Sequence, residues 1–150
     1  MRAYSFQDYS VLVNGVELSG FADGDDAFMA ERRVDSASDK VGADGKMMVS
    51  ISADKSGEFT FKLQQTSPSN KMLMALLGLQ EFSAKTFVPI NVIARDTYRN
   101  DVASGTVGYI KRPAPQQRGM EGTNQEWTIV TERMDLIFGD TAENGILGGL

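Results

Sequence analysis

The side chains that most often perform catalysis are absent from this sequence, which contains no histidine and no cysteine in its 150 residues. Histidine is the commonest general base and a frequent metal ligand, while cysteine supplies nucleophiles, zinc ligands and disulfides. Serine–histidine triads, thiolate zinc sites and disulfide frameworks are therefore excluded. The glycine-rich phosphate loops and the hydrolase nucleophile elbow do not occur either. We expect no catalytic residue, no metal site and no cofactor.

The densest acidic group is the segment Asp23-Gly24-Asp25-Asp26. An EF-hand loop beginning at Asp23 would need glycine at its sixth position and glutamate at its twelfth, but these positions hold Phe28 and Val34. Paired carboxylates such as Glu126 and Glu132 suggest a glycosidase dyad only weakly, because 20 acidic residues offer many such pairs. We interpret residues 23–26 as a solvated acidic turn or as a patch that faces a polyanion.

The charge balance and the apolar runs limit the partners of the chain. It carries 15 Lys and Arg against 20 Asp and Glu, a net charge of −5. Nucleic-acid binding depends on cations that displace counterions from phosphates, so this balance disfavours it. The longest apolar run, 72–79, is much shorter than the roughly 20 residues of a membrane helix. The N-terminus shows no apolar targeting segment, and we expect a soluble protein that contacts no membrane.

Strict alternation of apolar and polar residues is the clearest structural signal. It covers residues 46–54 and 58–66, and a period of two indicates strands with one buried face. The short link 55–57 contains a glycine and predicts that the two strands pair as an antiparallel hairpin. The predicted core combines their apolar positions with three leucines of a helix: Met47, Val49, Ile51, Phe59, Phe61, Leu63, Leu73, Leu76 and Leu77. The pattern does not separate core positions from positions that face a neighbouring subunit.

One helix is predicted, over residues 67–79. Ser67 is suited to the N-cap and Pro68 to the first helical position. Apolar residues follow at roughly helical spacing, and Gly78 is suited to end the helix. A helix this short must pack on a sheet to be stable.

Weaker strand signals occur around the turn dipeptide Asn14-Gly15 and further along the chain, at 9–13, 16–18, 28–34, 86–94 and 102–111. The segment 125–138 changes the phase of its apolar residues. A bulge near Glu132 would explain this change, as would a strand that serves one surface early and another late. A strand buried on both faces at its end is the alternative.

Long connections stand out at 35–45 and 112–124, because most connections span about four to six residues. An N-terminal arm, residues 1–9, and a glycine-containing tail, 139–150, flank the rest. Loops this long in a small protein are usually functional or disordered. No internal repeat or shift in composition divides residues 1–150, so we expect a single, mainly β domain with one short flanking α-helix and long projecting loops.

The sequence resembles the tail tube proteins of contractile-tailed bacteriophages in the order of its segments and in three runs: FADGDD (21–26), DKVGADG (39–45) and FTFKLQQTSPSNK (59–71). The similarity covers most of the chain. It implies an antiparallel β-barrel or sandwich that forms six-fold rings, stacked into a hollow tube that conducts DNA. The type VI secretion tube protein would share this fold. None of the three runs is a chemical motif, so the resemblance indicates a lineage and not a mechanism.

The resemblance implies a structural protein of the virion tail, assembled in the cytoplasm of the host bacterium. Its partners would be further copies of itself, the sheath, the baseplate and the tail terminator. The tape measure protein or DNA would occupy the channel without specific binding. Two physical arguments agree: open sheet edges must be paired or covered, and head-to-tail pairing of identical subunits can close a ring. An acidic channel wall would also repel DNA and leave it mobile.

Two sets of residues are candidates for these roles. The candidate channel acids are Asp23, Asp25 and Asp26. The alternative for these acids is a turn on the outer surface. The channel wall would then be lined by Glu58, Lys62 and Gln64. The candidate inter-subunit contacts lie in the N-terminal arm, the 35–45 loop and the last strand: Tyr4, Phe6, Tyr9, Asp39, Lys40, Val41, Met134, Leu136 and Phe138. We expect the arm and the loop to be mobile in a free subunit. A ligand-binding β-barrel, monomeric or a small oligomer, and a phage-encoded enzyme are the rival functions.

Overall fold

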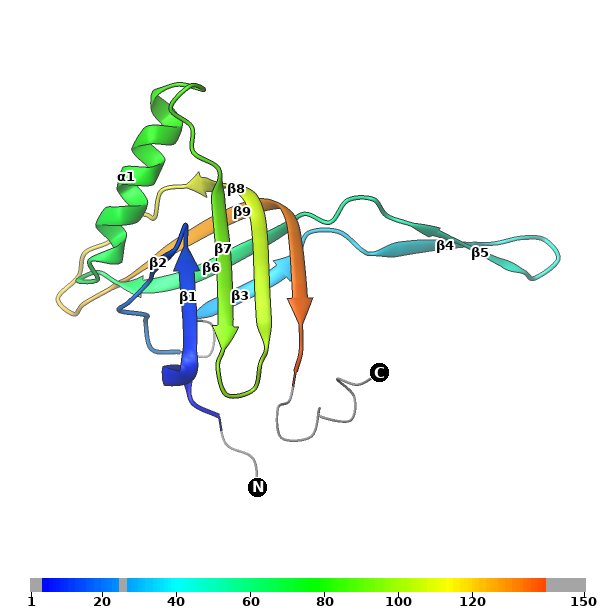
Figure 1. Cartoon of the computed structure of the whole chain (residues 1–150), viewed down its shortest axis with the longest axis horizontal. Coiled ribbons are helices and arrows are strands. Elements are labelled where there is room, and N and C mark those ends of the chain that lie inside the picture. The colour runs from blue at the N-terminus through cyan, green and yellow to red at the C-terminus, as the bar shows by residue number, and fades with distance from the viewer. Residues whose placement is uncertain (1–3, 25–26, 140–150) are drawn as a thin grey trace.

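The computed structural model of the chain describes residues 4–24 and 27–139. Its body is a seven-stranded antiparallel sheet with the strand order β2-β1-β7-β8-β9-β6-β3, and two further strands, β4 and β5, project from it (Figure 1). The elements are a 3-10 turn (Phe6–Asp8), β1 (Tyr9–Val13), β2 (Val16–Glu17), β3 (Phe28–Arg32), β4 (Ala37–Val41), β5 (Met47–Ile51), β6 (Gly57–Gln64), α1 (Ser69–Phe82), β7 (Ile90–Asp96), β8 (Val102–Arg112) and β9 (Asn124–Ile137). The prediction of a mainly β, antiparallel fold with one helix is confirmed.

The core lies between the curved sheet and α1. Its largest fully buried side chains come from β1, β6, α1, β7, β8 and β9: Val11, Val13, Phe59, Phe61, Leu63, Leu73, Ile90, Val92, Ile110, Trp127, Ile129 and Met134. The predicted core positions on β6 are confirmed, as are Leu73 and Leu77. Leu76 is half-buried and packs against the same cluster. Large side chains thus fill the interior of the sheet.

The predicted pairing of residues 46–54 with 58–66 is wrong. β6 lies between β3 and β9, with Phe61 opposite Phe28 on one side and Trp127 on the other. β5 pairs instead with β4, which lies within the predicted 35–45 loop. The link 55–57 lies where the chain passes from the projecting pair to β6 in the body, so it is not a hairpin turn.

Three predicted core residues therefore lie outside the core. Met47, Val49 and Ile51 are 61%, 57% and 83% exposed. Their alternation correctly marks a strand with one apolar face, but this face has no partner within the described part of the subunit. Alternation identifies the face of a strand and not the element that covers it.

Helix α1 begins close to the predicted position, at Ser69 with Pro68 as its N-cap, and ends later than predicted. The Ser67 hydroxyl accepts a hydrogen bond from the Ser69 N–H at 3.2 Å, and Pro68 has helical backbone angles. Gly78 does not end the helix, which continues to Phe82. Polar contacts of two helix residues hold α1 on the sheet. The Trp127 indole N–H donates to the side-chain oxygen of Asn70 at 2.9 Å. The Gln80 amide donates to the Ile110 carbonyl and accepts from the Ile110 N–H.

The weaker strand predictions also hold in part. Asn14 and Gly15 both have positive φ and form the turn between β1 and β2, as predicted. β7 begins at Ile90, later than predicted, just after Pro89. The register between β8 and β9 runs without a shift past Glu132, so the predicted bulge does not occur on this ladder. β9 instead leaves its ladder with β6 after residue 131 and continues along β8.

Aromatic rings connect the two ends of the curved sheet. Tyr9 of β1 lies 5.6 Å from Phe28 of β3, measured between ring centroids. Phe6 stacks on Tyr9 at 5.7 Å and meets the edge of Phe21 at 5.4 Å. These side chains therefore hold the two ends of the sheet together, although β1 and β3 do not pair through backbone hydrogen bonds.

Candidate assembly interface

The projecting pair of strands is the most unusual surface of the subunit. We call it the hairpin arm: β4, β5 and the turn between them, residues 37–51. Every residue of β4 and β5 is exposed, and Figure 1 shows the arm extending well beyond the body. A two-stranded hairpin alone is marginally stable in water at best. The arm therefore calls for a surface to pack against.

The register of the arm separates an apolar face from a polar one. Directly opposed residues share a face, so one face carries Ala37, Asp39, Val41, Met47, Val49 and Ile51. The other face carries Ser38, Lys40, Met48 and Ser50. A soluble monomer rarely exposes a continuous apolar strip of this kind, whereas interaction sites commonly do.

The base of the arm is fastened to the body by backbone hydrogen bonds. The Arg33 N–H donates to the Ser56 carbonyl at 3.1 Å, and the Met134 N–H donates to the Lys55 carbonyl at 2.8 Å. Beneath this point a Cβ added to Gly57 would lie 2.5 Å from the Met134 side chain. Only glycine lets β6 and β9 approach so closely there. The arm thus leaves the body from a firmly packed base.

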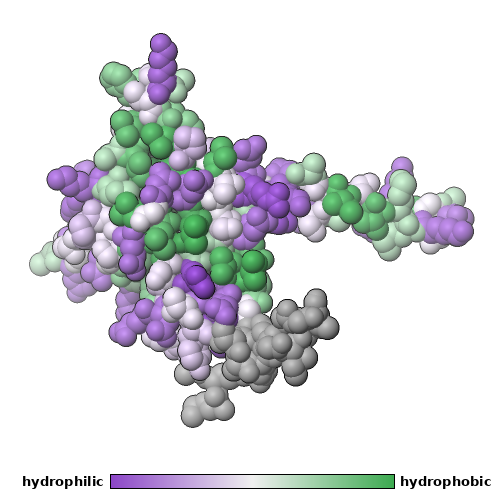
Figure 2. All heavy atoms as spheres, viewed as in Figure 1, coloured by the Kyte–Doolittle hydropathy of each residue, from purple (hydrophilic) through white to green (hydrophobic). Residues whose placement is uncertain are grey.

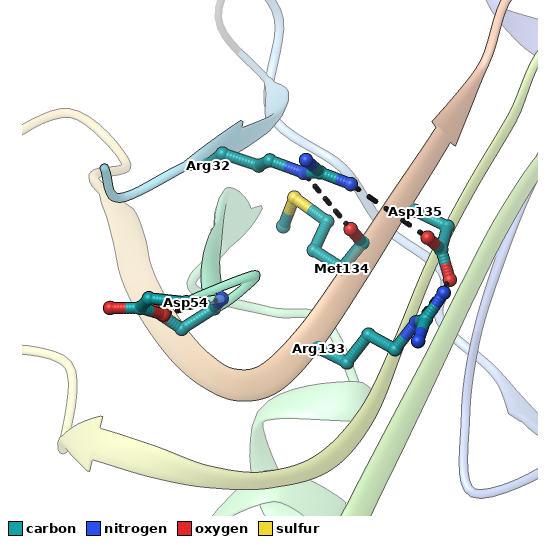
Figure 3. A network of polar contacts seen from close by, with 6 residues as sticks. Arg32, Asp54, Arg133, Met134 and Asp135 are labelled. Atoms are coloured by element: carbon teal, nitrogen blue, oxygen red, sulfur yellow. Dashed lines mark hydrogen bonds and ion pairs between the residues drawn. The ribbon is translucent and has the colours of Figure 1, made fainter. Parts of the chain in front are cut away.

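Charged side chains reinforce the same base (Figure 3). The Arg32 guanidinium donates to the Met134 carbonyl at 3.2 Å and lies 3.8 Å from the Asp135 carboxylate. Asp135 also accepts from Arg133 at 3.1 Å. In the segment between β5 and β6, the Ser56 N–H donates to the Asp54 carboxylate, which holds the pKa of that carboxyl below its usual range. These contacts orient the arm relative to the sheet.

The structure places the three predicted contacts of the 35–45 loop, Asp39, Lys40 and Val41, on β4. Asp39 and Val41 lie on the apolar face, and Lys40 on the polar face. The sequence analysis missed the partner strand of β4 as part of this interface. The turn Gly42-Ala43-Asp44-Gly45 was the available signal, because Gly and Asp in such a turn are typical of a hairpin.

The N-terminal arm is only partly free. Tyr4 is 65% exposed, whereas Phe6 and Tyr9 pack against aromatic residues of their own subunit. The rings of Phe6 and Tyr9 therefore bridge the ends of the sheet. Mobility of the arm in a free subunit stays a prediction. Burial and the nearby carboxylates of Asp96 and Asp101 raise the pKa of Tyr9 to about 12.

The predicted contacts of the last strand divide into two groups. Met134 is fully buried in the core, so it is not available to another subunit in this conformation. Leu136 and Phe138 are 37% and 85% exposed. They line an apolar groove of about 180 Å³ with Tyr9, Phe28, Ala30, Val102 and neighbouring residues.

The structure describes one of the three candidate channel acids. Asp23 is exposed and borders a polar groove of about 290 Å³ with Gln64 and Thr123. Asp25 and Asp26 lie outside the described residues, as does the C-terminal tail after Gly139.

The alternative channel face on β6 is mixed in charge. Glu58 and Lys62 alternate with buried residues and so point away from the core. Glu58 lies 3.4 Å from Lys111 and 3.9 Å from Arg33. Basic partners therefore offset its negative charge.

The acidic side chains of residues 4–24 and 27–139 form no candidate metal site. This part of the chain contains no group of three or more acidic, histidine or cysteine side chains placed to hold a metal ion. In the same residues, no helix has the length and apolar character to cross a membrane.

Comparisons with solved structures identify the fold. The chain is similar to the tube-terminating cap of the anti-feeding prophage, with a TM-score of 0.64 and 9% identity over 93% of each chain. It is also similar to the sheath/tube terminator of an extracellular contractile injection system, PVC, with a TM-score of 0.67 and 10% identity over 91% of this chain and 98% of that one. A chain of the PVC sheath-tube complex gives a TM-score of 0.62 and 11% identity over 87% and 88%.

The sequence itself places the chain in a family. No curated protein sequence matches it significantly. The family model described as the bacteriophage PhiTE tail tube protein, however, matches residues 1–139. A tail tube protein is a structural component of the virion tail and not an enzyme. The chain therefore belongs to the family of the PhiTE tail tube protein.

Proposed function

We propose that this protein assembles head to tail into hexameric rings, and that the rings stack into the inner tube of a contractile tail through which DNA passes. The hairpin arm is the observation that carries this proposal. Its apolar face has no cover within the described part of the subunit, and its base is oriented by the contacts of Arg32, Lys55 and Met134. A second copy of the chain would supply the cover.

The edges of the sheet support a ring. β2 and β3 end the seven-stranded order, and unpaired edges favour association with another chain. Because β2 and β3 are different strands, a contact between one edge and the other is heterologous. Such a contact closes into a ring if its rotation divides a full turn.

The partners and the channel follow from the same assembly. The sheath, the baseplate and the terminator would contact the stacked rings, with the tape measure protein or DNA inside. Assembly would take place in the host cytoplasm. Asp23, Asp25 and Asp26 are the proposed channel acids, since repetition of an acidic turn around a narrow channel would concentrate its field and repel DNA.

A ligand-binding barrel receives less support. Its interior would need a cavity lined by a few polar groups. In the described residues, large side chains such as Trp127, Phe59 and Ile129 fill the interior, each at most 1% exposed.

Electron microscopy of the purified protein tests the proposal. The parent chain should form rings or tubes, and Val49→Asp should abolish them, since it places a charge on the apolar face of the arm. Met120→Asp is the matched control, because Met120 is fully exposed outside the arm. A parent chain that stays monomeric, or a Val49→Asp variant that polymerises like the control, would contradict the proposal.

The channel acids require a separate experiment. Asp23, Asp25 and Asp26 are changed together to lysine in particles that still assemble, and DNA ejection is timed at several salt concentrations. Slower, salt-dependent ejection is expected. Unchanged ejection at low salt, where screening is weakest, would place these acids elsewhere.

A further inference from the structure

Helix α1 is apolar on the side that its own sheet does not cover. Residues 72–79 contain no charged or polar side chain. Leu73 and Leu77 face the core, while Met74, Leu79 and Phe82 are 50%, 46% and 81% exposed. Figure 2 shows hydrophobic residues over the outward side of this helix. A helix that is apolar all round is normally buried all round, so the outer side calls for a cover.

A glycine at the centre of this outer side has no explanation within the subunit. Gly78 lies one turn after Met74 and one turn before Phe82, and the helix does not end there. A Cβ added to it would meet nothing within 4 Å. Glycine weakens a helix interior relative to alanine, and a conformational reason is absent because its φ is not positive. A missing side chain lets another backbone lie close against the helix.

The apolar face of the hairpin arm matches this surface in length and in apolar character. From Met47 to Ile51 a strand spans about 13 Å, and from Met74 to Phe82 a helix spans about 12 Å. Asp39 is the one charged residue on the apolar face of the arm. The apolar helix surface is flanked by charges of both signs, since Lys71, Glu81 and Lys85 are all exposed.

The positions of the two surfaces allow contact only between copies. The arm and α1 lie on opposite sides of the body (Figure 1). A contact between opposite sides of identical subunits is heterologous and continues from copy to copy. It therefore suits a repeating assembly rather than a closed dimer.

We propose that the apolar face of the hairpin arm docks on the outer side of α1 in a second copy, over Gly78. This inference rests on the proposed function, since it needs an assembly in which copies repeat. The apolar strip meets Met74, Leu79 and Phe82.

Cross-linking identifies the docking surface. The chain has no cysteine, so an introduced cysteine is the only thiol with which the cross-linking reagent can react. Val49→Cys co-expressed with Ala75→Cys should give a covalent dimer with a short bis-maleimide reagent. Val49→Cys alone, or with Leu136→Cys in the apolar groove, should not. Polymers in which Val49→Cys joins Leu136→Cys or itself would overturn this contact alone, whereas absence of any polymer would overturn the proposed function with it.

Substitution of Gly78 gives an independent test with a built-in control for folding. Gly78→Gln should raise or preserve the thermal unfolding midpoint of the subunit, because the site is open and glutamine favours helix. The same change should abolish polymers seen by electron microscopy, because the side chain occupies the space of the docked strand. Gly78→Ala, with a single methyl group, should stabilise the subunit and weaken assembly less. Normal polymers from Gly78→Gln would overturn the proposal.

Discussion

Replacement of Phe61 by alanine tests which of the two alternating segments forms the core. Phe61 is fully buried, and its ring lies within 6.5 Å of Phe21 and Phe28. Removal of a buried phenylalanine side chain costs about 3–5 kcal/mol, because it loses both transfer free energy and packing contacts. For a domain of this size, the midpoint of thermal unfolding should fall by roughly 6–20 °C.

Met47 of β5, in the other alternating segment (46–54), provides the matched comparison. Met47 has the same apolar character and the same alternation, but it is 61% exposed on the hairpin arm. Met47→Ala should change the free energy of unfolding of the subunit by no more than about 0.5 kcal/mol. Both variants are measured as dilute subunits by chemical denaturation, with the fluorescence of the single tryptophan, Trp127, as the probe. Equal losses from both variants, or a Phe61→Ala variant as stable as the parent, would refute the assignment.

Three further predictions concern the arm, a buried phenol and the helix. Replacement of residues 37–51 by a short glycine-serine link should leave a folded subunit that no longer polymerises, since Ser36 and Ser52, which remain, are joined by a hydrogen bond. Tubes seen by microscopy for this variant would contradict a role of the hairpin arm in assembly. The pKa of Tyr9 is raised to about 12, so the unfolded chain loses this proton at lower pH than the folded one, and the free energy of unfolding should fall as the pH rises from about 10 to 12. Denaturation of Tyr9→Phe at pH 9–12 should show a smaller loss of stability. Asn70→Ala should cost about 1–3 kcal/mol, because it leaves the buried Trp127 indole N–H without its acceptor; an unchanged unfolding free energy would contradict this.

Local patterns predicted local structure well. The alternation in β6 located a strand and its buried face, because one-sided burial imposes a period of two. The Ser67-Pro68 pair located the start of α1, because its hydroxyl and fixed backbone angle suit a helix N-terminus. The dipeptide Asn14-Gly15 located a turn, because both residues tolerate positive φ.

The pairing of strands could not be predicted in the same way. β5 alternates as strictly as β6, yet it pairs with β4. The apolar face of β4 is not recognisable in the sequence, because Asp39 lies between Ala37 and Val41. An apolar face reads the same in sequence whether its own chain or a neighbour covers it. The exposed face of the hairpin arm was therefore mistaken for core.

The candidate site shows the same limit. The sequence predicted Asp39, Lys40 and Val41 as assembly residues from the length of their loop, without the strand that aligns them. It also assigned Met134 to the interface, because an apolar residue near the end of a strand gives no sign of the bend that turns it inward. Sequence alone carries no information on such long-range geometry.

Methionine oxidation measures most directly whether assembly covers the hairpin arm. Mild peroxide converts exposed thioethers to sulfoxides, and mass spectrometry gives the rate at each methionine. In the free subunit Met47 should react almost as fast as the fully exposed Met120, while the buried Met134 stays unreacted. In the assembled protein, the rate at Met47 should fall toward that of Met134. A rate at Met47 that is the same in free and assembled protein would contradict the account, because the arm would then remain open to solvent.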